Sequence, residues 1–504
     1  MAGRDLVTVA GGLVLMPGWG AERRDIVIDG DTIRDIVPTG TGPADVRIID
    51  AADRAVMPGL VNGHLHGHGT LAKGRVEDRW SLEFFLNALP GLGANRTLDD
   101  KYLNGLVGAV EMIRKGSTAC FDLFFEFPRP SPDGLFALGQ AYSDAGIRAV
   151  VAPMVADRTF YQAYPELLEL MTDEQRDEAL ALNMAPHRAS ASSAAEAFRR
   201  WPFDRDRVRP GLAPAIPLHC SDDFLIACRD LVAEYDIPLQ THLAEAKSQA
   251  VAGLRRYGRT LTAHIEALGL LGPRFSAAHA IWLDADDMRR LADSGASVIH
   301  APPSNLRFGS GLAQVRAMRE LGVNVGLATD AANSSDHLNM FEAMRLGASI
   351  STLLTPDVDH WLGVGDMLDM ATAGSARAMG FEARIGSIAP GYKADLVFLD
   401  LGHINYVPLG NLARQIVFAE NGAAVDSVMI GGRMVLDRGR ITTLDEAKLR
   451  RDAAAAADRL FAANAPMRET AKRLEPAIRA FCRSVACQSY HVHRLACEAT
   501  CHPA

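Results

Sequence analysis

Residues 61–69 read VNGHLHGHG, in which three histidines alternate with leucine and glycine. They follow MPGL (57–60), and together these residues are typical of a buried strand that ends in polar side chains. In a strand, side chains two positions apart point to the same face. His64 and His66 are therefore predicted to project together at the end of a strand, while Leu65 points away.

Seven further apolar runs follow this one before about residue 380, and helical segments separate most of them. In order, the runs are STACFDLFF, GIRAVVAPM, VRPGLAPA, IPLQTHL, FSAAHA, ASVIHAPP and VNVGLATD. Thr97, Ser221 and Asp284 each precede a helical segment with acidic residues in its first turn, so we predict that they are N-caps. Strands alternating with helices predict an α/β fold, a (β/α)8 TIM-type barrel. An open doubly wound parallel sheet is the alternative.

The two ends of the chain differ from the middle in their pattern of apolar and turn-forming residues. Residues 1–57 read as short β-rich runs around turns, and residues 381–445 repeat this pattern, with a hairpin turn at Gly431-Gly432. We predict that these segments form one small β-sandwich built from both termini. The barrel then spans residues 58–380, and residues 446–504 form a terminal helix and a tail that contains cysteine and histidine.

Composition narrows the classes of function. The chain has 504 residues, 48% of them hydrophobic, which is enough for at least one large core. Its net charge of −9 is dispersed and no long Lys/Arg run occurs, so nucleic acid and anionic membranes are disfavoured as partners. The opening MAGRDLVTVAGGLVLMPGWG lacks a basic start followed by an apolar core, so we expect no export signal, and no stretch approaches the ~18 uninterrupted apolar residues of a membrane span. We therefore expect a soluble cytoplasmic protein that acts on a small molecule.

Four of the seven cysteines lie close together near the C-terminus. These are Cys482, Cys487, Cys497 and Cys501, with His491, His493 and His502 nearby. A small zinc knot is one interpretation, but the C-x4-C-x9-C-x3-C spacing contains no tight ligand pair. A disordered tail is the favoured interpretation.

Polar residues also end the later strands of the predicted barrel. LQTHL contains His242, SAAHA contains His279, SVIHA contains His300, and VGLATD ends in Asp330. A single buried histidine would need no explanation beyond a hydrogen bond, but repetition at one end of successive strands indicates a shared site. Three imidazoles and one carboxylate suit Zn²⁺ or Fe²⁺. We predict that the ligands of one divalent metal are His64, His66, His242 and Asp330.

A bound cation of this kind lowers the pKa of water to about 7, which allows attack on an electrophilic carbon at neutral pH. Glu245 follows His242 by three residues, just past the strand end. We predict that it is a catalytic proton-shuttling carboxylate; the alternative is a glutamate on a surface helix.

Substrate contacts are expected from the loops that follow the strands. His68, flanked by glycines, is predicted to lie in the pocket wall; an exposed loop histidine is the alternative. Trp80, Trp282 and Asn305 are further predicted substrate-binding residues, although ordinary packing would explain them equally well. An aromatic slot would suit a flat heterocycle.

The chain resembles the amidohydrolase superfamily. The resemblance rests on the order H-x-H, His with Glu three later, His, then Asp, and on PGLVNGHLH, AAHAIWLD, PPSNLRFGSG and GVNVGLATDAANSSDHLNMFEAMRLG. It runs from about residue 5 to 445. The sequence is most similar to the branch of S-adenosylhomocysteine and methylthioadenosine deaminases and triazine hydrolases of the atrazine chlorohydrolase type.

The resemblance implies specific roles. It implies one metal held by the four predicted ligands and a homo-oligomer. His279 would orient or polarise the water, and Glu245 would protonate a ring nitrogen. Asp330 would take the proton of the water and pass it to the leaving amine.

The chain also departs from the family pattern. The fourth-strand segment VRPGLAPAIPLHC has no lysine, so the carbamylated lysine of binuclear relatives is missing. Where the nucleoside-type deaminases show PHAPYTCS, residues 214–221 read PAIPLHCS. Ala215 thus replaces a substrate-contacting histidine, which puts ribosyl substrates in doubt, and His219 is a candidate substitute. Ala331 stands where glycine usually follows the aspartate.

The sequence therefore predicts a metal-dependent aminohydrolase that attacks a C–N bond of an amino-substituted N-heterocycle and releases ammonia or an amine. Hydrolysis of an acyclic amide, urea or carbamate is the alternative, and a non-catalytic scaffold is a third possibility. The chain lacks the H-x-E…P-C-x-x-C set, a P-loop and a dinucleotide G-x-G-x-x-G motif. Nucleic-acid editing, phosphoryl transfer and dinucleotide-dependent oxidation are therefore disfavoured.

Overall fold

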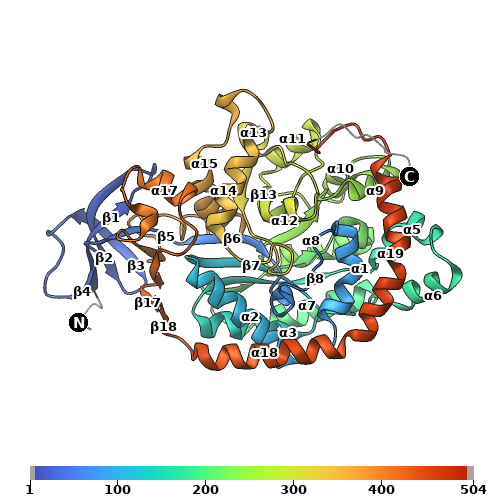
Figure 1. The fold of residues 1–504 in the computed structure, drawn as a ribbon, viewed down its shortest axis with the longest axis horizontal. Helices are drawn as coiled ribbons and strands as arrows, with labels where there is room; N and C mark the ends of the chain where they lie inside the picture. The colour runs from blue at the N-terminus through green and yellow to red at the C-terminus, as the bar shows by residue number, and fades with distance from the viewer. Residues whose placement is uncertain (1–5, 497–504) are drawn as a thin grey trace.

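A computed structural model describes residues 6–496 of the chain (Figure 1). Within this range, two parallel sheets run β10-β8-β7-β6, with β9 beside β8, and β11-β12-β13-β14. The strands are β6 (Leu60–Leu65), β7 (Ser117–Phe125), β8 (Arg148–Val155), β9 (Val208–Pro210), β10 (Ala213–Pro214), β11 (Leu239–Leu243), β12 (Phe275–His279), β13 (Ser297–His300) and β14 (Asn324–Leu327).

Backbone hydrogen bonds join the two parallel sheets at both edges. The amide of Gln240 donates to the carbonyl of Leu212 over 3.0 Å, and the amide of Asp330 donates to that of His64 over 3.1 Å. The strands thus follow one another in chain order around a closed ring, and the predicted α/β class is confirmed. The run VRPGLAPA forms two short strands instead of one, because Pro210 and Pro214 have no N–H to donate to a ladder.

Helices connect the strands and cover the outside of the ring. From β6 to β9 they are η1 (Gly67–Ala72), α1 (Leu82–Gly93), α2 (Leu98–Arg114), α3 (Pro132–Ala145), α4 (Phe160–Ala163), α5 (Pro165–Glu169), α6 (Asp173–Ala181) and α7 (His187–Arg199). After β10 come η2 (Pro217–His219), α8 (Asp222–Tyr235), α9 (Lys247–Tyr257), α10 (Leu261–Ala267), α11 (Ala285–Ser294), α12 (Pro302–Arg307), α13 (Val315–Glu320), α14 (Met340–Ser351), η3 (Val358–His360), α15 (Val364–Asp369), η4 (Met370–Gly374), α16 (Ser375–Ala378), η5 (Ile404–Tyr406) and α17 (Leu412–Phe418).

The three predicted N-caps are confirmed. Thr97 accepts a hydrogen bond from the amide of Asp100 at the start of α2, and the Asp100 carboxylate accepts one from the Thr97 amide, which makes a capping box. Ser221 caps α8 by accepting a hydrogen bond from the amide of Phe224, and Asp284 makes a second capping box with Asp287 at the start of α11. These caps fix where the connecting helices begin, and so how the loops at the strand ends leave the ring.

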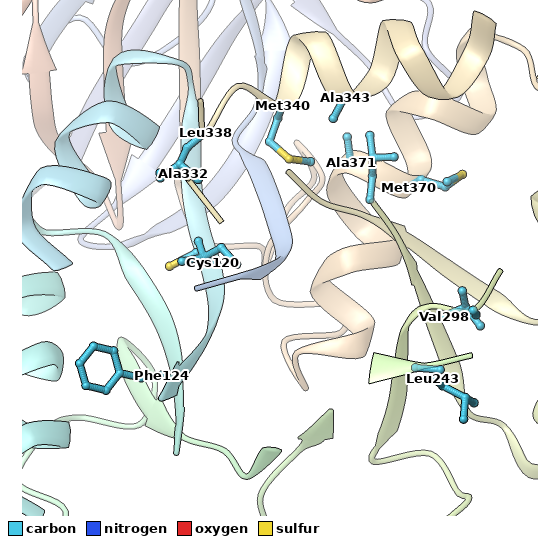
Figure 2. Packing of buried hydrophobic residues seen from close by; sticks show 14 of the residues in the cluster. Cys120, Phe124, Leu243, Val298, Ala332, Leu338, Met340, Ala343, Met370 and Ala371 are labelled. Carbon is cyan, nitrogen blue, oxygen red and sulfur yellow. The ribbon is translucent and has the colours of Figure 1, made fainter. Parts of the chain in front are cut away.

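The main apolar core lies between the strands and the helices. Figure 2 shows part of it, with Cys120 and Phe124 contributed by β7 and Met340 and Ala343 contributed by α14. Burial of these side chains holds the helices against the outside of the strands. His66, His242 and Asp330, at or just past the strand ends, face one cavity.

A third sheet is built from both ends of the chain and lies at one end of the molecule, on the left in Figure 1. Among the described residues its path is β18-β17-β16-β15-β5-β1-β2-β3, with β4 on β1. The bounds are β1 (Leu6–Leu15), β2 (Ala21–Asp29), β3 (Thr32–Pro38), β4 (Arg47–Asp50), β5 (Arg54–Pro58), β15 (Leu396–Asp400), β16 (Val425–Ile430), β17 (Arg433–Asp437) and β18 (Arg440–Ile441). The predicted hairpin at Gly431-Gly432 is confirmed, with both glycines at positive φ between β16 and β17.

Two helices follow this sheet, where a single terminal helix was predicted. They are α18 (Glu446–Ala463) and α19 (Ala465–Ala486), which run along the lower and right edges of the molecule in Figure 1. The break falls at Asn464, whose side chain is hydrogen-bonded to the Asn95 side chain and to the Ala94 carbonyl. Pro466 has no N–H with which to continue the hydrogen bonds of α18.

The zinc-knot interpretation depends on residues that lie outside the described part of the chain, namely Cys497, Cys501 and His502. No helix in residues 6–496 is long and apolar enough to cross a membrane.

Candidate active site

The polar residues that end the strands meet at one point. His64 lies in β6 and His66 directly follows it, His242 lies in β11, and Asp330 follows β14. The Nε2 atoms of His66 and His242 are 3.0 Å apart. The Asp330 Oδ1 atom is 3.7 Å from Nε2 of His64 and 3.6 Å from Nε2 of His66. The structure thus brings the four proposed ligands together.

His279, at the end of β12, completes the group. Its Nε2 atom is 3.9 Å from Asp330 Oδ2 and 3.7 Å from Glu245 Oε1. The ligand atoms of His64, His279 and Asp330 all lie within 4.8 Å of one another. One small volume is therefore surrounded by four imidazoles and two carboxylates.

A hydrogen-bond acceptor faces the Nδ1 atom of each imidazole, on the side of the ring away from the centre of the cluster. Because the partners are carbonyl oxygens, each Nδ1 carries the proton and each Nε2 presents a lone pair to the centre. The pairs are His64 with Gln240 Oε1 at 2.6 Å, His66 with the Leu123 carbonyl at 2.8 Å, His242 with the Ala215 carbonyl at 2.6 Å, and His279 with Asn305 Oδ1 at 2.8 Å.

This arrangement fits a metal cation. The lone pairs of His66 and His242 face each other at 3.0 Å, and the buried Nε2 atoms of His64 and His279 have no hydrogen-bond partner. Burial lowers the pKa of His64, His66 and His242, so these rings stay neutral. Converging lone pairs beside a carboxylate would repel one another, and a divalent cation among them removes that repulsion.

Backbone strain is concentrated at the same strand ends. His279, Ala280 and Asp330 adopt positive φ values of 67°, 50° and 65°, and Ala244 adopts 49°. The left-handed region costs a non-glycine residue about 1–3 kcal/mol, and such strain persists where the surrounding structure enforces it. At His279 and Asp330, the strained backbone belongs to residues whose side chains lie in the cluster.

Glu245 lies in the loop between β11 and α9 and not on a surface helix. It is 3% exposed, and its amide donates to Gln249 Oε1 over 3.0 Å. Burial raises the pKa of its carboxyl group to about 7. A carboxyl group with that pKa holds and releases a proton near neutral pH, as a general acid requires.

The cluster forms the floor of a cavity of about 460 Å³. His66, His242, Glu245 and Asp330 line the floor. The walls are largely apolar and include Leu82, Phe85 and Leu89 of α1, together with Phe160, Met184 and Phe308. The volume and the apolar walls are those of a site for a small organic molecule.

The structure separates the predicted substrate-binding residues into two groups. His68 and His219 line the cavity, and burial lowers the pKa of both. Trp80 packs behind the cavity wall, and the buried indole of Trp282 donates to the Ser310 carbonyl over 2.8 Å. Asn305 holds His279. Substrate contact by the last three residues stays a prediction.

One polar residue at a strand end lies apart from the cluster, and three residues that line the main cavity were not predicted from the sequence. His300 lines a separate cavity of about 300 Å³ beside α13 and α14. Arg158, Asn333 and Met467 line the main cavity, although sequence reasoning did not identify them. Only Asn333 had a signal, its position three residues after Asp330. Met467 comes from α19, for which no motif suggested a role in the cavity.

Comparison with known proteins agrees with this geometry. A family model described as the amidohydrolase family matches residues 55–435. The chain belongs to the amidohydrolase family. This amidohydrolase is accordingly a hydrolase that acts on carbon–nitrogen bonds other than peptide bonds, as its relatives named deaminases also do.

Two curated relatives show the likeness in sequence. The amidohydrolase is 32% identical over 400 residues to a 5-methylthioadenosine/S-adenosylhomocysteine deaminase of Syntrophobacter fumaroxidans, covering 79% of this chain and 84% of the relative. It is 31% identical over 451 residues to a 5'-deoxyadenosine deaminase of Methanothermobacter thermautotrophicus, covering 88% and 97%.

Solved structures show the likeness in fold. An adenosine deaminase from Xanthomonas campestris with bound zinc has a TM-score of 0.78 at 27% identity, covering 90% of this amidohydrolase and 98% of that chain. An atrazine chlorohydrolase from Arthrobacter aurescens, complexed with zinc, has a TM-score of 0.80 at 23% identity, covering 90% and 100%. The fold of these neighbours implies a TIM barrel.

Proposed function

We propose that this amidohydrolase is a metal-dependent aminohydrolase that replaces an exocyclic amino group of an N-heterocycle by water and releases ammonia or an amine. The observation that carries the proposal is the placement of buried Glu245 and His279 beside converging imidazoles, with 3.7 Å between Glu245 Oε1 and His279 Nε2. A proton donor placed beside a metal site is what an aromatic amine requires, because its ring nitrogen must accept charge during attack. Relatives named as deaminases support this choice of reaction.

We propose that one zinc ion per chain is held by His64, His66, His242 and Asp330. The three imidazole nitrogens and the carboxylate oxygen are the donor set that Zn²⁺ prefers, and two of the structural neighbours hold zinc. When bound, a divalent cation supplies Lewis acidity that lowers the pKa of water to about 7. The absence of lysine in β9 and β10 supports one metal over two.

The side chains of the floor have distinct proposed roles. Glu245 donates its proton to the ring nitrogen as the carbon–oxygen bond forms. His279, held through Nδ1 by Asn305, orients the attacking water with its free Nε2. Asp330 accepts the proton of the water and passes it to the amine as the carbon–nitrogen bond breaks. The remaining hydroxyl proton returns to Glu245 as the ring carbonyl forms, so that overall one water adds and one ammonia or amine leaves.

The walls are proposed to bind the ring and its substituent. The rings of Phe85 and Phe308 lie 5.0 Å apart, centroid to centroid, and line the cavity, which suits stacking on a flat heterocycle. We propose that His68 and His219 supply polar contacts in the otherwise apolar wall. Ala215 is also part of the wall. The nucleoside-type pattern has a histidine at this position, so the wall lacks that imidazole here.

Ammonia release from zinc-loaded protein tests the proposal. The panel contains aminopurines, aminopyrimidines, pterins and aminotriazines, with anilides and phenylureas beside them. We expect ammonia from at least one heterocycle and none when Asp330→Asn protein replaces the native chain. Cleavage confined to the anilides and phenylureas would move the function to acyclic C–N bonds. No turnover of any compound by protein with full metal content would overturn the proposal.

We also propose a domain organisation and a setting for the enzyme. Residues 1–57 and 381–445 would form one β-sandwich. The pairing of β5 with β15 supports this, as does a shared apolar cluster that includes Val14, Ile28 and Phe398.

Exposed apolar side chains on η5 and α17, such as Ile404 and Phe418, support a homo-oligomer. Free cysteines without disulfides among the described residues support the cytoplasm. Light scattering would test the assembly.

A further inference from the structure

We propose that the carboxamide of Asn333 binds the polar edge of the substrate beside the reacting carbon. The site would then favour rings in which an acceptor nitrogen lies next to the exocyclic amino group, as N7 does in an aminopurine. This inference rests on the proposed function and deepens it, because it names a specificity-determining residue and the edge of the ring that it reads.

Asn333 occupies a position from which it can touch substrate. It is 2% exposed and lines the cavity together with Asp330 and Ala331. Its Oδ1 atom has no hydrogen-bond partner. A buried amide without a hydrogen-bond partner is less stable than the same amide in water, because it has lost its hydrogen bonds to water. A ligand that hydrogen-bonds to the amide removes this penalty.

The loop that carries Asn333 does not use the carboxamide to hold its own shape. The Ala331 carbonyl accepts hydrogen bonds from the amides of Ser334 and Ser335 at 3.0 and 3.1 Å. The Ser334 hydroxyl also donates to this carbonyl over 3.0 Å, and the single hydroxyl proton of Ser335 goes to the nearer of its two acceptors, the His337 carbonyl at 2.8 Å. The two serines therefore fix the turn, and the carboxamide is left for another partner.

Gly69 makes room for the carboxamide. A Cβ atom on Gly69 would lie 2.2 Å from Asn333 Oδ1 and 2.8 Å from its Cγ, so any side chain there would displace the amide. Gly69 also lines the cavity and belongs to the turn that begins directly after the proposed ligand His66. The close approach places the amide over the loop that follows β6, next to the floor.

The chemistry of a carboxamide selects the edge that it can bind. It offers an acceptor oxygen and a donor NH₂ side by side, which complements an exocyclic N–H and a neighbouring ring nitrogen, as in the pairing of asparagine with adenine N6 and N7. Glu245 is proposed to protonate the ring nitrogen on the other side of the reacting carbon. Asn333 and Glu245 would then hold the two flanks of the same carbon.

Two ring probes test this assignment without turnover. 1-Deazaadenine keeps the amino group and N7 but lacks the ring nitrogen that Glu245 would protonate, and 1,7-dideazaadenine lacks N7 as well. Calorimetry on the full-length zinc-loaded protein would measure binding of both probes to the native chain, Asn333→Ala, Asn333→Asp and Ser335→Ala. Asn333→Asp keeps the shape of the side chain and removes its donor. Ser335→Ala perturbs the same loop without touching the cavity.

The native protein and Ser335→Ala are expected to bind 1-deazaadenine about tenfold more tightly than 1,7-dideazaadenine. Both Asn333 variants should lose that preference, mainly through weaker binding of 1-deazaadenine. A preference that survives in Asn333→Ala, equal binding of the two probes by the native chain, or binding of neither would overturn the assignment. Ammonia release from the heterocycle panel is independent of this result, so failure of the Asn333 assignment and failure of the proposed reaction are distinguishable.

Discussion

The floor of the cavity and its walls are built in different ways. On the floor, each imidazole is fixed by a second partner such as Gln240 or Asn305, and the reactive atoms converge within hydrogen-bond or ion-pair distances. The walls come from segments without common spacing, including α1, α4, and Met467 of α19. Chemistry and selectivity are thus carried by separate parts of the chain. Changes on the floor should stop the reaction for every substrate, whereas changes in the walls should alter which substrates bind.

Removing a floor ligand should have the largest effect. His242→Ala deletes one of the two Nε2 atoms that face each other at 3.0 Å. We expect the metal content to fall well below one per chain and kcat/KM to fall at least about a thousandfold for all substrates. His360→Ala is the matched control, because this histidine side chain is exposed. Full metal content in His242→Ala would show that this side chain is not a ligand.

Glu245→Gln should come next, with a loss of about 10²–10⁴-fold in kcat. Burial raises the pKa of Glu245 to about 7, and the proposed role requires the protonated form, so kcat/KM should fall as the pH rises through the midpoint. The positive charge of a bound cation would move that midpoint below 7. The variant should lack this limb of the pH profile. A profile that is the same in both proteins would remove Glu245 from the role of proton donor.

Gln240→Leu probes the support of the floor. Gln240 Oε1 faces His64 Nδ1 at 2.6 Å, and its loss frees the ring to take the wrong tautomer. We expect zinc affinity to fall about 10–100-fold, measured by competition with a chelator. Gln140→Leu, on an exposed face of α3, should leave zinc affinity unchanged. Equal affinity in both variants would mean that the hydrogen bond does not orient the ligand.

Met467→Ala should have the smallest effect and one that depends on the substrate. Met467 lines the cavity from α19, outside residues 55–435 that match the family. Shortening it should raise KM a few-fold for substrates with bulky apolar substituents and leave kcat on small rings unchanged. Met434→Ala in β17, remote from the cavity, is the control. A fall in kcat on every substrate would contradict the separation of floor and walls.

Much of the floor could be predicted from the sequence because strand periodicity constrains it. His64 and His66 are two positions apart at the end of β6, and His242, His279 and Asp330 lie at or just past the ends of β11, β12 and β14. One architectural assumption therefore brings all five together. The α/β class and the three N-caps followed from equally local signals. Such features depend on residues close in sequence or on a repeated pattern.

The walls could not be predicted in the same way. Trp282 is an aromatic residue three positions after His279, yet it packs in the core and bonds to Ser310, because loop geometry and not spacing decides where it points. Asn305 supports His279 instead of lining the cavity. Met467 reaches the cavity only because α19 packs against α1, a contact between elements far apart in sequence. The break at Asn464 likewise depends on a tertiary contact with Ala94.

Anomalous X-ray diffraction at the zinc edge, from crystals of the full-length protein grown with zinc, measures the arrangement of the floor directly. We expect a single strong peak per chain, within bonding distance of Nε2 of His64, His66 and His242 and of the Asp330 carboxylate. A peak held by other residues, or no peak here in protein that still releases ammonia, would contradict it.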